Sequence, residues 1–138
     1  MEIQNIMHRK LILKGWSVSV GSMDALTGLL LILQPRLVLK LLGIREISTE
    51  SCVFLSWIGV FVFAVGLSYG FALGGRERGE FVWIYTALTR MLVAIFLTVH
   101  ILDGSLSRAW GWVALSDASV AGVQWAILRA KWWKEVAK

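Results

Sequence analysis

Three ionisable residues stand inside long apolar stretches of this 138-residue chain: Asp24, Arg90 and Asp117. A charged side chain at the centre of a membrane helix costs about 2.5–3.5 kcal/mol on insertion scales, so such groups pair with one another or face a hydrated cavity. Two carboxylates around one arginine can perform acid–base chemistry. One aspartate, kept protonated by burial, donates a proton, the other activates water, and the arginine orients both.

The depths of these residues in their apolar stretches predict that they meet. Counted from the same side of the membrane, Asp24 and Arg90 each lie about nine residues in, roughly 13 Å at the helical rise, and Asp117 lies about thirteen residues in, roughly 20 Å. An arginine side chain is long enough to span part of that offset, and its fork can donate to both carboxylates. We expect Asp24 and Arg90 to be in contact, directly or through one water molecule.

Other polar side chains fall near this group. Asp117 and Gln124 are seven residues apart on one face of a helix with Ser116 at its flank, and Thr86 precedes Arg90 by one helical turn. The ligand-binding residues predicted from these positions are Asp24, Tyr69, Thr86, Arg90, Ser116, Asp117 and Gln124. If the chain is an enzyme, its catalytic residues are predicted to be Asp24, Arg90 and Asp117.

Composition places the chain in a membrane. Hydrophobic residues make up 57% of it and the mean hydropathy is +0.70, which leaves too little polar surface for a soluble domain. The net charge is +5, but the basic residues flank apolar stretches instead of forming one stripe, a pattern typical of membrane orientation and not of nucleic-acid binding. Cys52 is the single cysteine and no Cys/His spacing suits zinc. We expect no nucleic-acid partner, metal or cofactor.

Four segments have roughly the 20 apolar residues that a membrane-spanning helix needs. The predicted fold is therefore all-α, one domain over residues 1–138 that forms a four-helix transmembrane bundle. Residues 36–44 are amphipathic and predict a short helix in the interface after the first span, or an extension of that span beyond a kink at Pro35. The predicted spans are 15–34, 52–73, 81–102 and 109–130.

Lysine and arginine counts predict the orientation. Nine of these residues flank the spans on the side of the two termini, and four lie on the opposite side. Because basic loops stay in the cytoplasm, both termini are predicted to be cytoplasmic in an inner or plasma membrane. We expect the first span to act as its own insertion signal.

Small residues predict how the helices pack. The second span carries Gly59, Gly66, Gly70 and Gly74 at helical spacing, and the first carries Ser17, Gly21 and Gly28 on the face of Asp24. Such stripes let two membrane helices approach closely. Six tryptophans are expected at the membrane interfaces: Trp16, Trp83, Trp110, Trp112, Trp132 and Trp133. The other two, Trp57 and Trp125, are expected to pack between helices.

The run LTGLLLILQPRLVLKLLGI, residues 26–44, with a polar loop and three further spans after it, resembles small four-helix membrane proteins of the DoxX-like kind. Those proteins often have a glycine-containing apolar first span, a proline at its end and an amphipathic turn that ends in LLG. The resemblance covers the whole chain in outline and residues 26–44 in detail. It implies the fold, and no site residue is transferred from it.

Three functions fit these features. The first is a binding protein or accessory subunit that holds a lipid, a quinone or another apolar molecule, or docks onto a larger membrane complex. The second is a membrane-embedded hydrolase, isomerase or cyclase acting on an isoprenoid, epoxide or sterol-like substrate. The third is an ion or proton pathway, which a chain this small would form as a homo-oligomer. A purely structural clasp that fixes the helix register is the alternative to all three. The absence of a catalytic motif favours the first.

Overall fold

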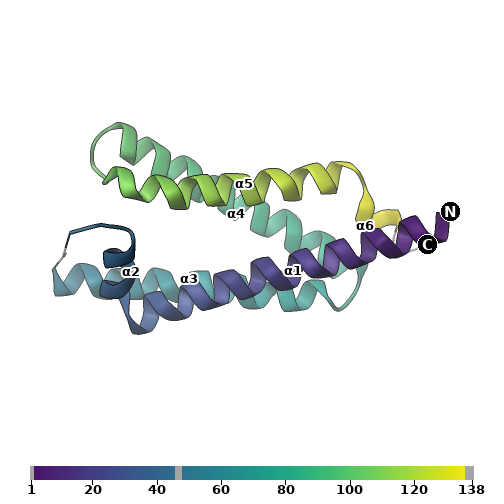
Figure 1. Ribbon diagram of the computed structural model, residues 1–138, viewed down its shortest axis with the longest axis horizontal. Coiled ribbons are helices and arrows are strands. Elements are labelled where there is room, and N and C mark those ends of the chain that lie inside the picture. Colours follow the sequence, from purple (N-terminus) through teal and green to yellow (C-terminus); the bar gives the residue numbers. More distant parts are fainter. Residues whose placement is uncertain (1, 46–47, 136–138) are drawn as a thin grey trace.

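The computed structural model describes residues 2–45 and 48–135, and these residues form helices joined by short turns, with no strand among them (Figure 1). Helix α1 (Glu2–Leu33) starts well before the predicted boundary at residue 15. It has 32 residues and is therefore about 48 Å long, so it extends beyond the apolar thickness of a bilayer.

Pro35 ends α1 and starts a separate short helix. A proline in the interior of α1 would remove a backbone donor and clash with the preceding turn, and Gln34 leaves the helical conformation at φ −141° and ψ 57°. Helix α2 (Pro35–Leu41) then begins with the proline in its first turn. Gly43, at φ +69°, reverses the chain, and the N–H of Ile44 donates to the carbonyl of Leu39 at 2.9 Å. The segment is thus a new helix and not an extension of the first span.

The remaining helices run back and forth along the molecule. Helix α3 (Thr49–Ala72) is capped by Ser48, whose hydroxyl accepts from the N–H of Ser51 at 3.1 Å. It is followed by α4 (Arg76–Leu102), the 3-10 turn η1 (Arg108–Trp110), α5 (Gly111–Arg129) and the short α6 (Trp132–Glu135).

Three of the described helices, α1, α3 and α4, are long and apolar enough to cross a membrane. Four such spans were expected, and α5 is not among the three. Asp117 and Gln124 lie within its 19 residues and lower its hydropathy. The described residues are thus all-helical, and three of their helices have the length and apolar composition of a membrane span.

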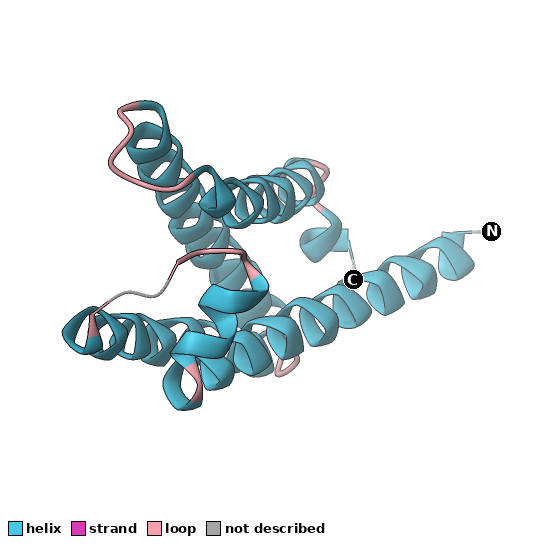
Figure 2. Cartoon of the chain, turned by 60° about the vertical axis from the view of Figure 1, so that its left-hand side comes forward, coloured by secondary structure: helices cyan, strands magenta, loops and turns pink. Residues whose placement is uncertain are grey.

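The long helices form two antiparallel pairs. α1 packs along α3 and α4 along α5, whereas the backbones of α1 and α5 hardly contact each other. The two pairs are close at the end where α6 lies beside the start of α1, and they diverge toward the end that carries α2 (Figures 1 and 2). Side chains, and not close backbone packing, therefore link α1 to α4 and α5.

Glycines bring α1 and α3 into backbone contact. A Cβ on Gly28 would lie 2.7 Å from the carbonyl oxygen of Gly59, and a Cβ on Gly66 would lie 2.7 Å from that of Gly21. The predicted packing faces are confirmed at these four positions. Gly70 and Gly74 do not belong to the contact: a Cβ on Gly70 would meet no atom within 4 Å, and Gly74 lies in the turn after α3.

Tryptophans form a core at the end of the molecule where α6 packs. Trp83 is fully buried, and its ring meets Trp133 edge to face and lies 6.4 Å from Trp16. Trp133 of α6 packs against Gly79 of α4, and Arg9 of α1 forms an ion pair with Glu135 at the surface. Trp83 and Trp133 are thus packed between helices and not exposed on the surface of the chain, and their level at the membrane interface stays a prediction.

Trp57 and Trp125 also differ from expectation. Both are exposed, Trp57 to 58%, although they were predicted to pack between helices. Trp57 lies two residues before Gly59 and therefore on the face of α3 turned away from α1. Trp125 follows the buried Gln124 and is rotated out of the seam between α4 and α5.

Candidate functional site

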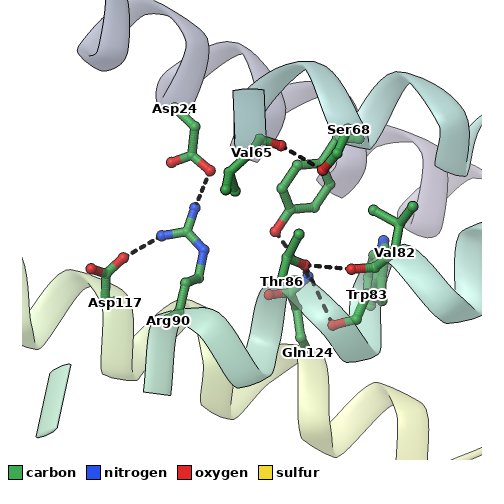
Figure 3. Close-up of polar contacts among 10 residues, drawn as sticks. Asp24, Val65, Ser68, Val82, Trp83, Thr86, Arg90, Asp117 and Gln124 are labelled. Atoms are coloured by element: carbon green, nitrogen blue, oxygen red, sulfur yellow. Dashed lines mark hydrogen bonds and ion pairs between the residues drawn. The ribbon is translucent and has the colours of Figure 1, made fainter. Parts of the chain in front are cut away.

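Arg90 links three helices. Its Nη2 donates to Asp24 Oδ2 on α1, and its Nη1 donates to Asp117 Oδ1 on α5 (Figure 3). The side chains are only 6% exposed for Arg90, 9% for Asp24 and 16% for Asp117. The predicted contact between Asp24 and Arg90 is confirmed, and Asp117 occupies the other branch of the fork.

Helical periodicity explains why these residues face one another. Trp83, Thr86, Ala87, Arg90, Ala94 and Leu97 form one buried stripe on α4, and Ala114, Asp117, Ala121 and Gln124 form the facing stripe on α5. These spacings of three and four residues place all members of a stripe on one side of a helix. The small alanines leave room for the arginine to reach across to α1.

A second polar group lies next along the bundle. The amide Nε2 of Gln124 donates to Tyr69 Oη at 3.0 Å and to Thr86 Oγ1 at 3.2 Å. Thr86 in turn donates to the carbonyl of Val82 at 2.8 Å (Figure 3). Tyr69, Thr86 and Gln124 are all buried, so three of the predicted ligand-binding residues bond to one another and not to the ionic group.

Two buried atoms in these groups have no hydrogen-bond partner among the described residues: Arg90 Nε and Gln124 Oε1. Either orientation of the Gln124 amide leaves one of its two polar atoms without a partner, because Tyr69 and Thr86 contact the same amide atom. An unpaired buried polar group costs about 1–3 kcal/mol. A polar atom from outside the chain, placed here, would recover that free energy.

Ser116 does not join the site. Its residue is exposed on α5, and no hydrogen bond links it to the ionic group in the described part of the chain. Ser116 lies one residue, and hence about 100° around the helix, from Asp117. Its predicted role at the flank of the site is therefore unsupported by its position.

One buried polar contact was not predicted. Trp83 Nε1 donates to Ser17 Oγ at 2.9 Å, and both residues are buried. The sequence spacing could have predicted this contact, because Ser17 precedes Asp24 by seven residues and Trp83 precedes Arg90 by seven. The same two helix faces that bring Asp24 to Arg90 thus bring Ser17 to Trp83, two turns away.

The surface has two hollows at the α2 end of the molecule. One lies along α2 and the turn after it, and the other lies between Pro35 and the first turns of α3. Neither is lined by Asp24, Arg90 or Asp117. Neither hollow is therefore a cavity beside the ionic group.

His100, Asp103 and Ser105 form a polar group in the loop after α4. His100 Nδ1 lies 2.8 Å from Ser105 Oγ and 3.2 Å from Asp103 Oδ2, and hydrogen bonds from Ser105 lower the pKa of Asp103. In a catalytic triad the serine and the carboxylate contact opposite ring nitrogens. Here both contact Nδ1, so this group shapes the turn and is not a nucleophilic site.

Comparisons of the chain with protein-family models, curated proteins and solved structures found no match.

Proposed function

We propose that this chain is a four-span membrane protein that binds an apolar molecule carrying one or two oxygen atoms. Asp24, Arg90 and Asp117 form the polar end of its site. The observation that supports this most directly is the pair of buried, unpartnered atoms, Arg90 Nε and Gln124 Oε1. One is a donor and the other an acceptor, so a hydroxyl or carbonyl group of a ligand, or a water molecule bound with it, matches them.

The second carboxylate also supports a site. A structural clasp needs only one carboxylate for each arginine, and replacing such a pair by packed apolar residues is often neutral or stabilising. Asp117 is an additional, partly buried acid, and it is the most exposed of the three charged side chains. A ligand would therefore approach the group from the side of α5.

We infer that α5 is the fourth span. Its 19 residues give a length of about 28 Å, close to the thickness of the apolar layer. Asp117 and Gln124, which lower its hydropathy, bond to partners inside the bundle, so these two polar side chains are not presented to lipid. The resemblance of residues 26–44 to DoxX-like four-helix proteins agrees with this count.

This topology predicts the location of two loops. Reporter domains fused after Lys138 and inserted at Ser105 should report opposite sides of the membrane, with the C-terminus in the cytoplasm. Alkaline phosphatase and green fluorescent protein fusions, which are active on opposite sides, measure this. If both reporters lie on the same side, α5 does not cross the membrane.

The ligand site predicts a specific effect of Asp117→Asn. The variant should keep its melting temperature, because Arg90 retains Asp24, but it should retain about tenfold less ligand, since a hydrogen bond to a charged group is lost. Native mass spectrometry and lipid analysis of the purified protein measure retention. Ser119→Ala is the matched control, because Ser119 is exposed on the same helix and bonds only to the carbonyl of Leu115.

Two outcomes would contradict this proposal. If wild-type protein holds no stoichiometric small molecule, the cluster serves only to join the helices. If Asp117→Asn unfolds the protein, the second carboxylate is structural.

A membrane-embedded enzyme is the second candidate, and the unequal exposure of the two carboxylates favours it. Paired acids in different environments divide the roles of proton donor and base. Asp117 uses only Oδ1 toward Arg90, which leaves Oδ2 to act on an isoprenoid, epoxide or sterol-like substrate. Conversion of the bound molecule to a product of different mass would distinguish an enzyme from a binding protein.

A further inference from the structure

A basic hollow lies at the α2 end of the molecule, far from the ionic group. The described residues that line it include three cations, Arg36, Lys40 and Arg45, and no carboxylate. Its volume of about 580 Å³ falls within the range of small-molecule sites. Three like charges around one hollow repel one another, so a bound anion would stabilise the hollow.

The fold holds these cations in place. Arg36 and Lys40 are one turn apart on α2, and the left-handed turn at Gly43 brings Arg45 back to the same hollow. Leu39 is buried against Leu31 and Leu55, which fixes α2 to the ends of α1 and α3. The position of the positive charge is thus set by the bundle.

Apolar side chains border the charges. Leu37, Leu39 and Ile44 line the hollow together with the cations, and Leu37 is 44% exposed. A free inorganic anion has no use for these residues, whereas a phospholipid offers a phosphate beside acyl chains. The hollow also lies where the apolar helices α1 and α3 end, which is the level of lipid headgroups.

We propose that this hollow binds the phosphate headgroup of an anionic phospholipid, with Arg36, Lys40 and Arg45 as its ligands. The acyl chains lie against Leu37 and the outer surface of the bundle. This site is separate from the one at Arg90, and its existence does not depend on what the Arg90 site binds.

The test is native mass spectrometry of the full chain from nanodiscs that contain equal amounts of phosphatidylglycerol and phosphatidylcholine. Each basic residue near an anionic lipid surface raises the binding constant by about fivefold. We therefore expect the wild-type protein to retain phosphatidylglycerol over phosphatidylcholine by at least about tenfold, and Arg36→Gln/Lys40→Gln/Arg45→Gln to lose most of that preference. All three residues are exposed, so the fold should persist.

A charge-matched control separates the hollow from general attraction. Lys10→Gln/Lys14→Gln/Arg129→Gln removes the same number of exposed cations away from it and should keep the preference. Equal retention of the two lipids, or equal loss in the control, would overturn the proposal. Displacement of the lipid by inorganic phosphate would overturn the lipid assignment and identify a phosphate site.

Discussion

Replacing Arg90 with glutamine is expected to lower the free energy of unfolding by about 3–5 kcal/mol, the range measured when one partner of a buried ion pair is removed. Asp24 and Asp117 would both lose their countercharge inside the bundle. Unfolding in mixed micelles of dodecyl maltoside and dodecyl sulfate, followed by tryptophan fluorescence, measures the change. Arg108→Gln is the control, because Arg108 is an exposed arginine in η1.

A double-mutant cycle tests the contact itself. Asp24→Asn and Arg90→Gln together should cost less than the sum of the two single changes, because Arg90→Gln leaves the Asp24 carboxylate without its countercharge and Asp24→Asn removes that carboxylate. The free energy of unfolding of Arg90→Lys should lie between those of the wild type and Arg90→Gln, since an ammonium group lacks the fork that reaches two carboxylates. Additive effects in the cycle would mean that Asp24 and Arg90 do not interact in the membrane.

Gly66→Ala is expected to destabilise the protein by about 3 kcal/mol, at the upper end of the cost of overpacking. The added Cβ would lie 2.4 Å from the backbone nitrogen of Ala25, and a backbone atom cannot turn aside as a side chain can. The two helices would have to separate along the contact that holds α1 to α3.

Gly70→Ala is the matched control in the same helix. Its Cβ would meet no atom within 4 Å, and alanine favours a helix over glycine by about 0.5–1 kcal/mol, so this variant should be slightly more stable. Opposite signs for the two substitutions, measured in the same micelles, identify the helix contact. Equal effects at both positions would place the packing face elsewhere.

Depth along the helices was sufficient to predict the central ion pair. Asp24 and Arg90 lie at matching levels because α1 and α4 run in the same direction and each residue is about equally far into its apolar stretch, and membrane burial forces opposite charges together. The glycine contact was equally accessible, since small residues at spacings of seven allow close approach only on one face. In both cases a local pattern has one low-energy solution.

Other features depend on contacts that sequence spacing does not contain. Trp83 and Trp133 are typical interfacial residues, but α1 and the return of α6 onto α4 bury them. Gly70 follows Gly66 by four residues, but it is exposed and turned away from α1, whereas its neighbour Tyr69 faces Gly21. The unpartnered oxygen of Gln124 follows from where Tyr69 and Thr86 lie in three dimensions.

The close contact of α1 with α3 also bears on the order in which the membrane protein is assembled. Chains are made from the N-terminus, so α1 and α3 can pair through Gly21, Gly28, Gly59 and Gly66 before α4 leaves the ribosome. Asp24 is then already held in the bilayer when Arg90 enters it. The α1/α3 pair would thus favour insertion of α4, because the carboxylate of Asp24 offsets the cost of placing Arg90 in the membrane. Arg90 would then pair with Asp117 when α5 follows.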